Sequence, residues 1–342
     1  MRSCHAHPSA PREAPAGSDG SPAIRSLATA PRVVIGVPVH QSERFLAETL
    51  ESVVAQDHPN IEIVVSDDAS TDATAAICQG FARRDPRVRL QRHPRRVGWI
   101  ANYNSLLPHA TGDYFLWVPH DDLYDPGYVR ELVALLEARP DAVLAYSATL
   151  AIDEGGRVVG GWARSARPGR HATRWHRALR YLWWTEREKF IPFRGVVRTR
   201  AIQIAGGLQD GEWGVFADDL WLFRLSLLGG FAHDARPLCR KRLHRGSISS
   251  TTRYTLPQRH AYLAAYRGIV REARLPWAET AGLLAAIPLR QAWVTAGWLL
   301  RRIDDYADSV AFLGRMRWYF SPAQTPRRLR KLAGRVPGTR AP

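Results

Sequence analysis

The sequence contains little cysteine, with three residues of this type in 342. They are Cys4, Cys78 and Cys239, and no two of them stand in a Cys-x-x-C spacing. Isolated thiols argue against a disulfide framework and against a structural zinc site, and they fit a reducing compartment. The fold must therefore depend on its apolar core, and a chain of this length that is 45% hydrophobic can bury one.

The sequence also lacks an uninterrupted apolar run that could cross a bilayer. The best candidate, residues 275–300, contains Glu279 and Arg290, whereas a membrane-spanning helix needs roughly 20 apolar residues. Residues 1–31 contain five prolines and no apolar stretch typical of a secretory signal, so we expect a disordered leader there. These absences favour a cytoplasmic protein.

Acidic residues are absent from the segment 309–342, which carries eight arginines and lysines. That is half of the formal net charge of +16. Such a segment could contact nucleic acid, anionic lipid or an anionic acceptor, or could simply be solvated. Aromatic residues such as Trp293, Trp298 and Trp318 lie among these arginines or shortly before them and suggest a membrane-touching surface, although packing against the catalytic domain would also explain them. We expect peripheral contact with the inner face of the cell membrane and do not expect nucleic-acid binding.

Strands and helices alternate along the middle of the chain. Short apolar, β-branched runs predict strands at 33–39, 61–65, 88–90, 114–118 and 142–146, and helical spacing predicts helices at 43–55, 72–84, 99–108 and 127–137. This alternation predicts an α/β fold with a mostly parallel sheet covered by helices on both faces. Helices expected at 257–274 and 278–310, the second broken near Pro288, form a C-terminal helical appendage. The expected domains are a leader (1–31), an α/β domain (32–250) and the basic appendage (251–342).

Pairs of aspartates follow two of the predicted strands. Asp67 and Asp68 end the second strand, and Asp121 and Asp122 follow the strand at 114–118. Ligands of parallel sheets bind beyond the carboxyl ends of strands. Adjacent carboxylates repel, and a hard cation such as Mg²⁺ or Mn²⁺ relieves that repulsion. Helix capping and Asx-turns explain each pair alone equally well.

A third pair, Asp218 and Asp219, begins an apolar pattern that predicts an amphipathic helix. Helix capping needs only one acid in this first turn, so the other is available as a general base. A base is needed because a sugar hydroxyl attacks poorly until its proton is removed in the transition state.

Together these segments resemble the large family of inverting glycosyltransferases called family 2, which has the GT-A fold, a Rossmann-like α/β arrangement. The likeness covers roughly residues 31–250. It rests on the sequences Val37-Pro38-Val39-His40, Leu50-Glu51-Ser52-Val53-Val54-Ala55-Gln56, Val65-Ser66-Asp67-Asp68-Ala69-Ser70-Thr71-Asp72, Val97-Gly98 with Asn102 and Asn104, Gly112-Asp113-Tyr114 and His120-Asp121-Asp122. Each motif alone is weak, but their order and spacing are specific.

The resemblance implies which residues bind a nucleotide-sugar donor. Pro38, His40 and Asp68 match positions that hold the base and ribose, although His40 stands where the family usually has tyrosine. Asn102 belongs to the same donor-binding motifs. Gly195 resembles the glycine of a loop near the donor sugar.

The resemblance also implies a metal site for Mg²⁺ or Mn²⁺. Asp121 matches the metal-binding aspartate of the family's Asp-x-Asp motif, and Asp122 follows it. The first aspartate of the motif is replaced by Pro119. His244 stands where a late histidine often completes the site, with a histidine on a basic surface loop as the alternative.

The catalytic base of the family usually lies six residues before an arginine. Counting back from Arg224 assigns Asp218 as the base and Asp219 as an acceptor contact or helix cap, and a slip of one residue exchanges them. The expected activity is metal-dependent inverting transfer of a sugar from a nucleotide-sugar to a glycan or lipid-linked acceptor, in cell-surface polysaccharide biosynthesis.

Two other functions compete with this prediction. A sugar-nucleotide pyrophosphorylase would need a glycine-rich phosphate loop directly after the first strand, and the residues 38–42 do not resemble one. A non-catalytic binding protein would instead use the basic C-terminal segment.

Overall fold

The computed structural model describes residues 30–162, 173–183, 190–247, 255–293 and 296. The chain divides into two compact units, Met1–Ala30 and Pro31–Pro342. Apart from Ala30, the described residues belong to the second unit. The predicted leader and the basic segment 309–342 lie outside the described residues.

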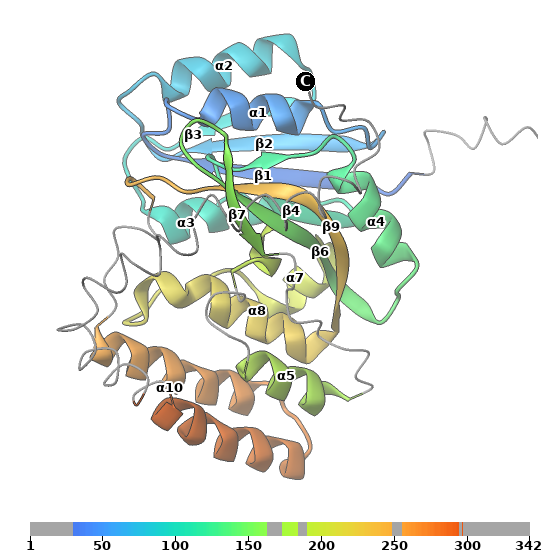
Figure 1. The fold of residues 1–342 in the computed structure, drawn as a ribbon, viewed down its shortest axis with the longest axis vertical. Coiled ribbons are helices and arrows are strands. Elements are labelled where there is room, and N and C mark those ends of the chain that lie inside the picture. The colour runs from blue at the N-terminus through green and yellow to red at the C-terminus, as the bar shows by residue number, and fades with distance from the viewer. Residues whose placement is uncertain (1–29, 163–172, 184–189, 248–254, 294–295, 297–342) are drawn as a thin grey trace, which may run out of the picture. The chain divides into compact units, whose positions relative to one another are not determined.

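The first half of the fold is a parallel α/β arrangement (Figure 1). Its elements are β1 (Val33–Val39), α1 (Leu46–Val54), β2 (Ile61–Asp67), α2 (Thr74–Arg84), β3 (Val88–Arg92), α3 (Trp99–Asn104), η3 (Leu107–His109) and β4 (Tyr114–Trp117). Strand β1 lies between β2 and β4 and runs parallel to both. The register pairs Val39 with Asp67, so the carboxyl ends of β1 and β2 finish together.

The second half adds strands in both directions. Its elements are β5 (Leu123–Tyr124), α4 (Tyr128–Glu137), β6 (Ala142–Ile152), β7 (Val158–Trp162), α5 (Arg174–Leu182), η4 (Pro192–Arg194), β8 (Val196–Arg198), α7 (Thr199–Ala205), η5 (Gly214–Phe216), α8 (Ala217–Leu228), β9 (Gly230–Arg242) and α10 (Leu256–Glu272). The described strands form one sheet in the order β3-β2-β1-β4-β8-β6-β9-β5, with β7 on β6. Strand β8 is antiparallel to both β4 and β6, whereas β6 and β9 are parallel. The mostly parallel sheet is confirmed, while β5, β7, β8 and β9 were not predicted.

The sheet separates two apolar cores because successive side chains of a strand point to opposite faces. Val33, Ile35 and Val37 of β1 contribute to the core beneath α1, α2 and α4. Val34 contributes to the other core, which is covered by α3, α7 and α8. Figure 1 shows these helices on the two sides of the sheet. A strand that is buried on both faces reads as a continuous apolar run, which is the pattern of β1.

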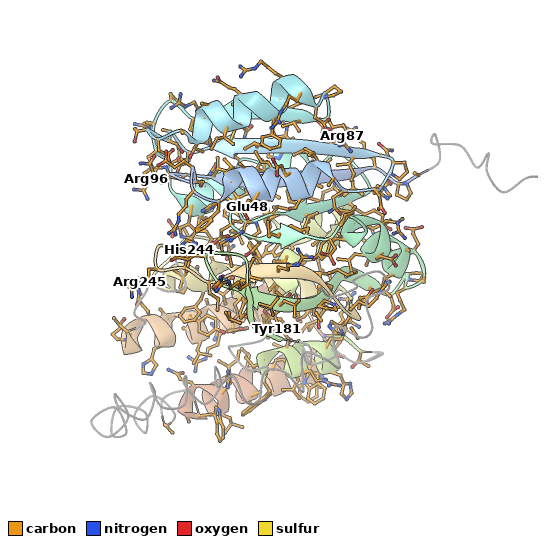
Figure 2. The ribbon with its side chains drawn as sticks, turned by 45° about the horizontal axis from the view of Figure 1, so that its top comes forward. Glu48, Arg87, Arg96, Tyr181, His244 and Arg245 are labelled. Atoms are coloured by element: carbon orange, nitrogen blue, oxygen red, sulfur yellow. The ribbon has the colours of Figure 1, made fainter. Side chains whose placement is uncertain are left out.

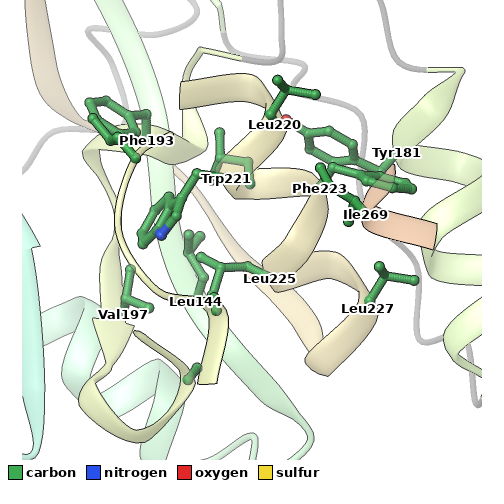
Figure 3. Packing of buried hydrophobic residues seen from close by; sticks show 14 of the residues in the cluster. Leu144, Tyr181, Phe193, Val197, Leu220, Trp221, Phe223, Leu225, Leu227 and Ile269 are labelled. Atoms are coloured by element: carbon green, nitrogen blue, oxygen red, sulfur yellow. The ribbon is translucent and has the colours of Figure 1, made fainter. Parts of the chain in front are cut away.

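The C-terminal helices pack on α8 rather than on the sheet. Tyr262 and Ile269 of α10, together with Leu283 and Ile287 of the helix over residues 277–293, belong to the same core as α8. Figure 3 shows Ile269 beside Phe223 of α8. The expected break near Pro288 is wrong, since the helix continues through that position. Ile287, the residue before this proline, is fully buried in the core, and the helix tolerates the hydrogen bond that a proline removes.

Within the described part of the chain, no helix combines the length and the apolar character that crossing a membrane requires. The predicted helical residues beyond 296 lie outside this part. The expected boundary at residue 250 stays a prediction.

Candidate active site

The site begins at the carboxyl ends of β1 and β2, where two tight turns meet. Gln41 and Ala69 adopt positive φ angles of 48° and 54°, a conformation that non-glycine residues rarely adopt. The turns hold each other, because the Gln41 amide donates to the Ser70 hydroxyl at 3.0 Å and the Thr71 amide donates to the Gln41 side chain at 2.8 Å. Strained backbone of this kind persists where surrounding contacts fix it, often at functional sites.

The predicted donor-binding residues Pro38, His40 and Asn102 are brought together at these turns. His40 Nδ1 lies 2.8 Å from the Asp68 carbonyl oxygen, so this nitrogen carries the proton. Asn102 is buried, and its side-chain amide donates to the carbonyl oxygens of Val39 and Ser66 at 3.2 and 3.1 Å. Asn102 therefore ties β1 to β2, and Pro38 lies in β1 opposite Ser66.

Asp68 holds a neighbouring loop. Its carboxylate accepts from the Val97 amide at 2.6 Å and from the Gly98 amide at 3.0 Å. Gly98 has a φ of 90°, which favours glycine. The adjacent Asp67 is fully buried, accepts from the Ser70 amide at 3.0 Å and lies 3.1 Å from Arg92 Nε. The two aspartates thus shape the loops that surround the turn, and a carboxylate has further lone pairs for a ligand.

Asp121 and His244 face each other across the sheet edge. Residues after β4 supply Asp121, and the residues after β9 supply His244, whose Nε2 lies 3.0 Å from Asp121 Oδ2. Burial alone would raise the pKa of Asp121, but the His244 hydrogen bond, together with the charges of His120 and Lys241, lowers it well below its ordinary value. Asp121 is thus held as a carboxylate. Figure 2 labels His244 and Arg245 in the segment beyond β9.

Asp122 points to different partners. It is fully buried, its Oδ2 lies 2.5 Å from Arg194 Nε, and its Oδ1 accepts from the Arg242 amide at 3.0 Å. Burial would lower the pKa of Arg194, yet the Asp122 carboxylate raises it above its ordinary value. Arg242 is also committed to the protein, because its side chain contacts the Asp121 carbonyl oxygen and the Glu48 carboxylate.

These contacts decide which residues fit a metal ion. Asp121 and His244 offer a carboxylate and an imidazole that now share a proton, which a cation could replace. Asp122 is engaged with Arg194 and Arg242, so it fits the expected role of metal ligand poorly. The described residues contain no cluster of three or more His, Cys, Asp or Glu side chains that could hold a metal by themselves. A Mg²⁺ or Mn²⁺ bound with one or two protein ligands and phosphate oxygens matches this pattern.

Gly195 follows η4 at a point where backbones approach closely. A Cβ placed there would lie 2.5 Å from the Ala145 carbonyl oxygen and 2.9 Å from that of Pro192. The glycine is therefore required by the packing of this loop on β6. It directly follows Arg194, the arginine that pairs with Asp122.

The first turn of α8 carries the last predicted pair. Asp219 is buried and accepts hydrogen bonds from Tyr181, Tyr262 and Tyr266. Asp218 is only partly buried, and among the described residues its carboxylate accepts one hydrogen bond, from the Asp219 amide at 2.7 Å. Burial, and next the charge of Asp219, raise the pKa of Asp218 to about 7.

The carboxylates of Asp121 and Asp218 interact electrostatically with the same neighbouring side chains. The charges of both carboxylates raise the pKa of Tyr103, after the larger effect of burial. The charge of Lys241 lowers the pKa of each carboxylate, while burial and then Arg194 lower the pKa of Lys241 itself. Sequence reasoning assigned no role to Tyr103, Lys241 or Arg194, because no motif marks them. The interactions of a buried arginine and of a lysine on a strand with carboxylates become visible only when the fold brings these residues together.

The sheet order and the carboxylates at its carboxyl edge define a GT-A-like α/β protein. Residues 34–200, just under half of the chain, match the sequence model of glycosyl transferase family 2. The match includes Asp68, Asp121 and Gly195 and ends before Asp218 and His244.

Curated relatives share part of this region. The chain is 35% identical over 127 residues to the putative glycosyltransferase EpsE of Bacillus subtilis, which covers 37% of this chain and 46% of that protein. It is 37% identical over 101 residues to the glycosyltransferase GlyA of Streptococcus pneumoniae, covering 30% of this chain and 14% of that one. The chain thus spans less than half the length of these relatives.

Solved structures share the fold over a longer stretch. The structure of TarS residues 1–349 from S. aureus in complex with UDP-GlcNAc superposes with a TM-score of 0.63 and 19% identity, covering 88% of this chain and 83% of that one. The same protein in complex with UDP gives a TM-score of 0.58 at 18% identity, with 75% and 70% covered. This likeness extends the shared fold well beyond residue 200.

Proposed function

We propose that this protein transfers a sugar from a nucleotide-sugar donor to a hydroxyl group of a glycan or lipid-linked acceptor, with inversion at the anomeric carbon. The observation that carries the proposal is the partly buried Asp218 carboxylate, in the same electrostatic environment as the Asp121–His244 pair. The match of residues 34–200 to the family 2 model supports the donor class.

Asp218 is the base of the proposed reaction. Its carboxylate takes the proton of the attacking hydroxyl group while the acceptor oxygen bonds to the anomeric carbon. The bond from that carbon to the donor phosphate oxygen breaks, and the nucleoside diphosphate leaves. A single in-line displacement inverts the configuration, through a transition state with oxocarbenium character. A pKa of about 7 suits a base that works near neutral pH.

The donor is proposed to lie along the carboxyl ends of β1 and β2. The turn that contains Pro38, His40 and Asp68 surrounds the nucleotide, and Lys241 provides positive charge for the diphosphate. Asp121 and His244 would hold Mg²⁺ or Mn²⁺, which when bound neutralises charge on the leaving diphosphate. Since a structurally similar protein binds UDP-GlcNAc, uridine nucleotide-sugars are the first donors to test.

A donor screen tests the proposal. The protein is incubated with UDP-, GDP- and dTDP-sugars and Mn²⁺, and the release of nucleoside diphosphate is measured with and without glycan acceptors. Asp218→Asn should lower turnover at least a thousandfold while the affinity for the nucleotide stays within about threefold. Asp210→Asn changes an exposed aspartate elsewhere and should retain activity. Full turnover in Asp218→Asn would refute the assignment of the base.

We extend the proposal to polysaccharide synthesis at the inner face of the cell membrane. The helix over residues 277–293 exposes Trp277 by 84%, Leu289 by 64% and Trp293 by 68%, as an interfacial helix would. Sedimentation with vesicles containing anionic lipid tests this contact. The double variant Trp277→Ala and Trp293→Ala should bind less, whereas Ile204→Ala, at an exposed residue of α7, should bind normally. If both variants bind the vesicles equally well, the helix over residues 277–293 does not contact the membrane.

A further inference from the structure

Asp219 occupies an unusual position for a residue at the start of a helix. Its carboxylate is buried and accepts from three phenol groups. Tyr181 of α5 donates to Oδ1 at 2.5 Å, while Tyr266 of α10 donates to Oδ2 at 2.9 Å and Tyr262 of α10 donates to the same oxygen. These donors come from two helices that lie far apart in the sequence.

The three tyrosines are themselves fixed by packing. Each is at most 2% exposed, and the hydroxyl groups of Tyr262 and Tyr266 lie 3.0 Å apart. Phe216 stacks on Tyr262 with ring centroids 4.3 Å apart, and Phe223 packs edge-on against Tyr266 at 4.5 Å. Figure 3 shows Tyr181 beside Phe223. Packed rings of this kind leave the hydroxyl groups little freedom to choose other partners.

Helix capping does not explain Asp219. The N-terminus of α8 has no hydrogen bond from a side-chain cap. If Asp219 were an apolar residue and the three tyrosines were phenylalanines, a similar volume would be filled without a buried carboxylate. Replacing buried charged groups by apolar groups of similar volume is often neutral or stabilising. The polar cluster is therefore not required by folding, which points to a role in function.

The cluster reaches Asp218 through the backbone. The Asp219 amide donates to Asp218 Oδ1 at 2.7 Å. The hydroxyl group of Tyr181 also lies 3.2 Å from the Asp219 carbonyl oxygen. The phenols thus hold both the side chain and the peptide of the residue whose N–H orients the Asp218 carboxylate.

We propose that Asp219, Tyr181, Tyr262 and Tyr266 form a positioning cluster through which α5 and α10 set the orientation of the Asp218 carboxylate toward the acceptor hydroxyl group. The inference rests on the proposed function, in which Asp218 is the base. Asp219 contacts neither donor nor acceptor in this account and acts through Asp218. Helices beyond the family-matched region would then control the geometry of proton removal.

The charges around the pair give the proposal a signature in pH dependence. Asp218 faces Asp219 from its own helix, Arg194 from the end of η4 and Lys241 from β9. The charge of Arg290, in the helix over residues 277–293, acts on Tyr266. Burial and then the Asp219 charge raise the pKa of Asp218. Removing the Asp219 charge alone should therefore move the acid limb of the rate profile to lower pH.

The test measures kcat, donor KM and the pH profile of Asp219→Asn, Tyr181→Phe and Tyr266→Phe in the full chain. Asp219→Asn should shift the acid limb to lower pH, because the Asp219 charge raises the pKa of Asp218. Each Tyr→Phe variant should lower kcat roughly tenfold with donor KM within twofold, because orientation and not donor binding is lost. Thermal unfolding monitored by circular dichroism checks that each variant folds.

Tyr114→Phe is the matched control. Tyr114 is a buried tyrosine that donates to a carboxylate, that of Glu137, at the opposite end of β4. If the cluster variants lose only thermal stability, with kcat and pH profile equal to those of Tyr114→Phe, the cluster is a packing element and the proposal is wrong. Asp218→Asn separates the two proposals, since its retained turnover would refute the base without any reference to the tyrosines.

Discussion

Arg194 Nε lies 2.5 Å from Asp122 Oδ2, and the two side chains are 7% and 0% exposed. This ion pair joins the turn before β8 to the loop after β4. Because Asp122 is occupied in this way, the neighbouring Asp121 is left to face His244. A motif that reads as two equivalent acids is divided by the fold into one structural and one chemically available carboxylate.

Replacing Arg194 by methionine should lower the free energy of unfolding by about 3–5 kcal/mol, because it leaves the Asp122 carboxylate buried without its counter-charge. Urea denaturation followed by fluorescence measures the change. Arg44→Ala is the control, since the Arg44–Glu154 pair is exposed and screened by solvent, so its loss should hardly change stability. Equal losses in both variants would contradict the structural role of the Asp122–Arg194 pair.

The rate of transfer should rise with pH through about 7 and then level off. Asp218 must be deprotonated to accept a proton, and burial followed by the Asp219 charge raises its pKa to about 7. Below that value kcat/KM should fall about tenfold per pH unit. Initial rates between pH 5 and 9 at fixed metal concentration check this. A profile that is flat down to pH 5 would mean that the base has an ordinary carboxylate pKa.

Chelation by EDTA should abolish transfer, and added Mn²⁺ should restore it. Asp121→Asn and His244→Ala should each raise the Mn²⁺ concentration needed for half-maximal activity by about tenfold to a hundredfold, because each removes a proposed ligand. Isothermal titration with Mn²⁺ in the presence of UDP gives an independent value. Asp141→Asn, which alters an exposed ion pair with Arg139, should leave it unchanged. Normal metal affinity in both site variants would place the metal elsewhere.

Asp68→Ala should weaken nucleotide binding about tenfold, since the amides of Val97 and Gly98 lose the carboxylate that fixes their loop beside the donor turn. Titration calorimetry with UDP measures the affinity. Asp85→Ala is a suitable comparison because Asp85 also accepts from a backbone amide, that of Arg87, but at the end of α2. Should both variants bind UDP normally, the turn would not be the nucleotide site.

Two glycine-to-alanine substitutions should change stability in opposite directions. Gly195→Ala places a Cβ 2.5 Å from the Ala145 carbonyl oxygen and should cost about 1–3 kcal/mol. Gly80→Ala lies within α2 with no heavy atom within 4 Å of the added Cβ, and should stabilise by up to about 1 kcal/mol. Thermal unfolding of the two variants compares them. A stable Gly195→Ala protein would show that the loop before β8 is free to move.

The parallel part of the fold could be predicted because its signals are local. The apolar run Val33–Val39 and the helical spacing of Leu46–Val54 each follow from neighbouring residues. The strands of the second half of the fold gave no such signal. Strand β8 is three residues long, and β9 mixes charged and apolar residues without a regular alternation, although it is paired with β6 over most of its length. Pairing of this kind depends on contacts between distant residues.

The site residues, like the strands, could be predicted only in part. The resemblance to family 2 was enough to suggest Asp121, His244 and Asp218, whose proposed roles remain to be tested. Spacing could not separate Asp218 from Asp219, because the difference lies in Tyr181 and α10, which are distant in sequence. Nor could it show that Asp122 is paired with a buried arginine.

The reversed direction of β8 decides which of its ends lies at the site edge. A parallel strand brings its last residues to the site edge, but β8, running the other way between β4 and β6, brings its first. Arg194 and Gly195 therefore lie at the site edge, and any displacement of β8 along its neighbours would move the arginine that pairs with Asp122.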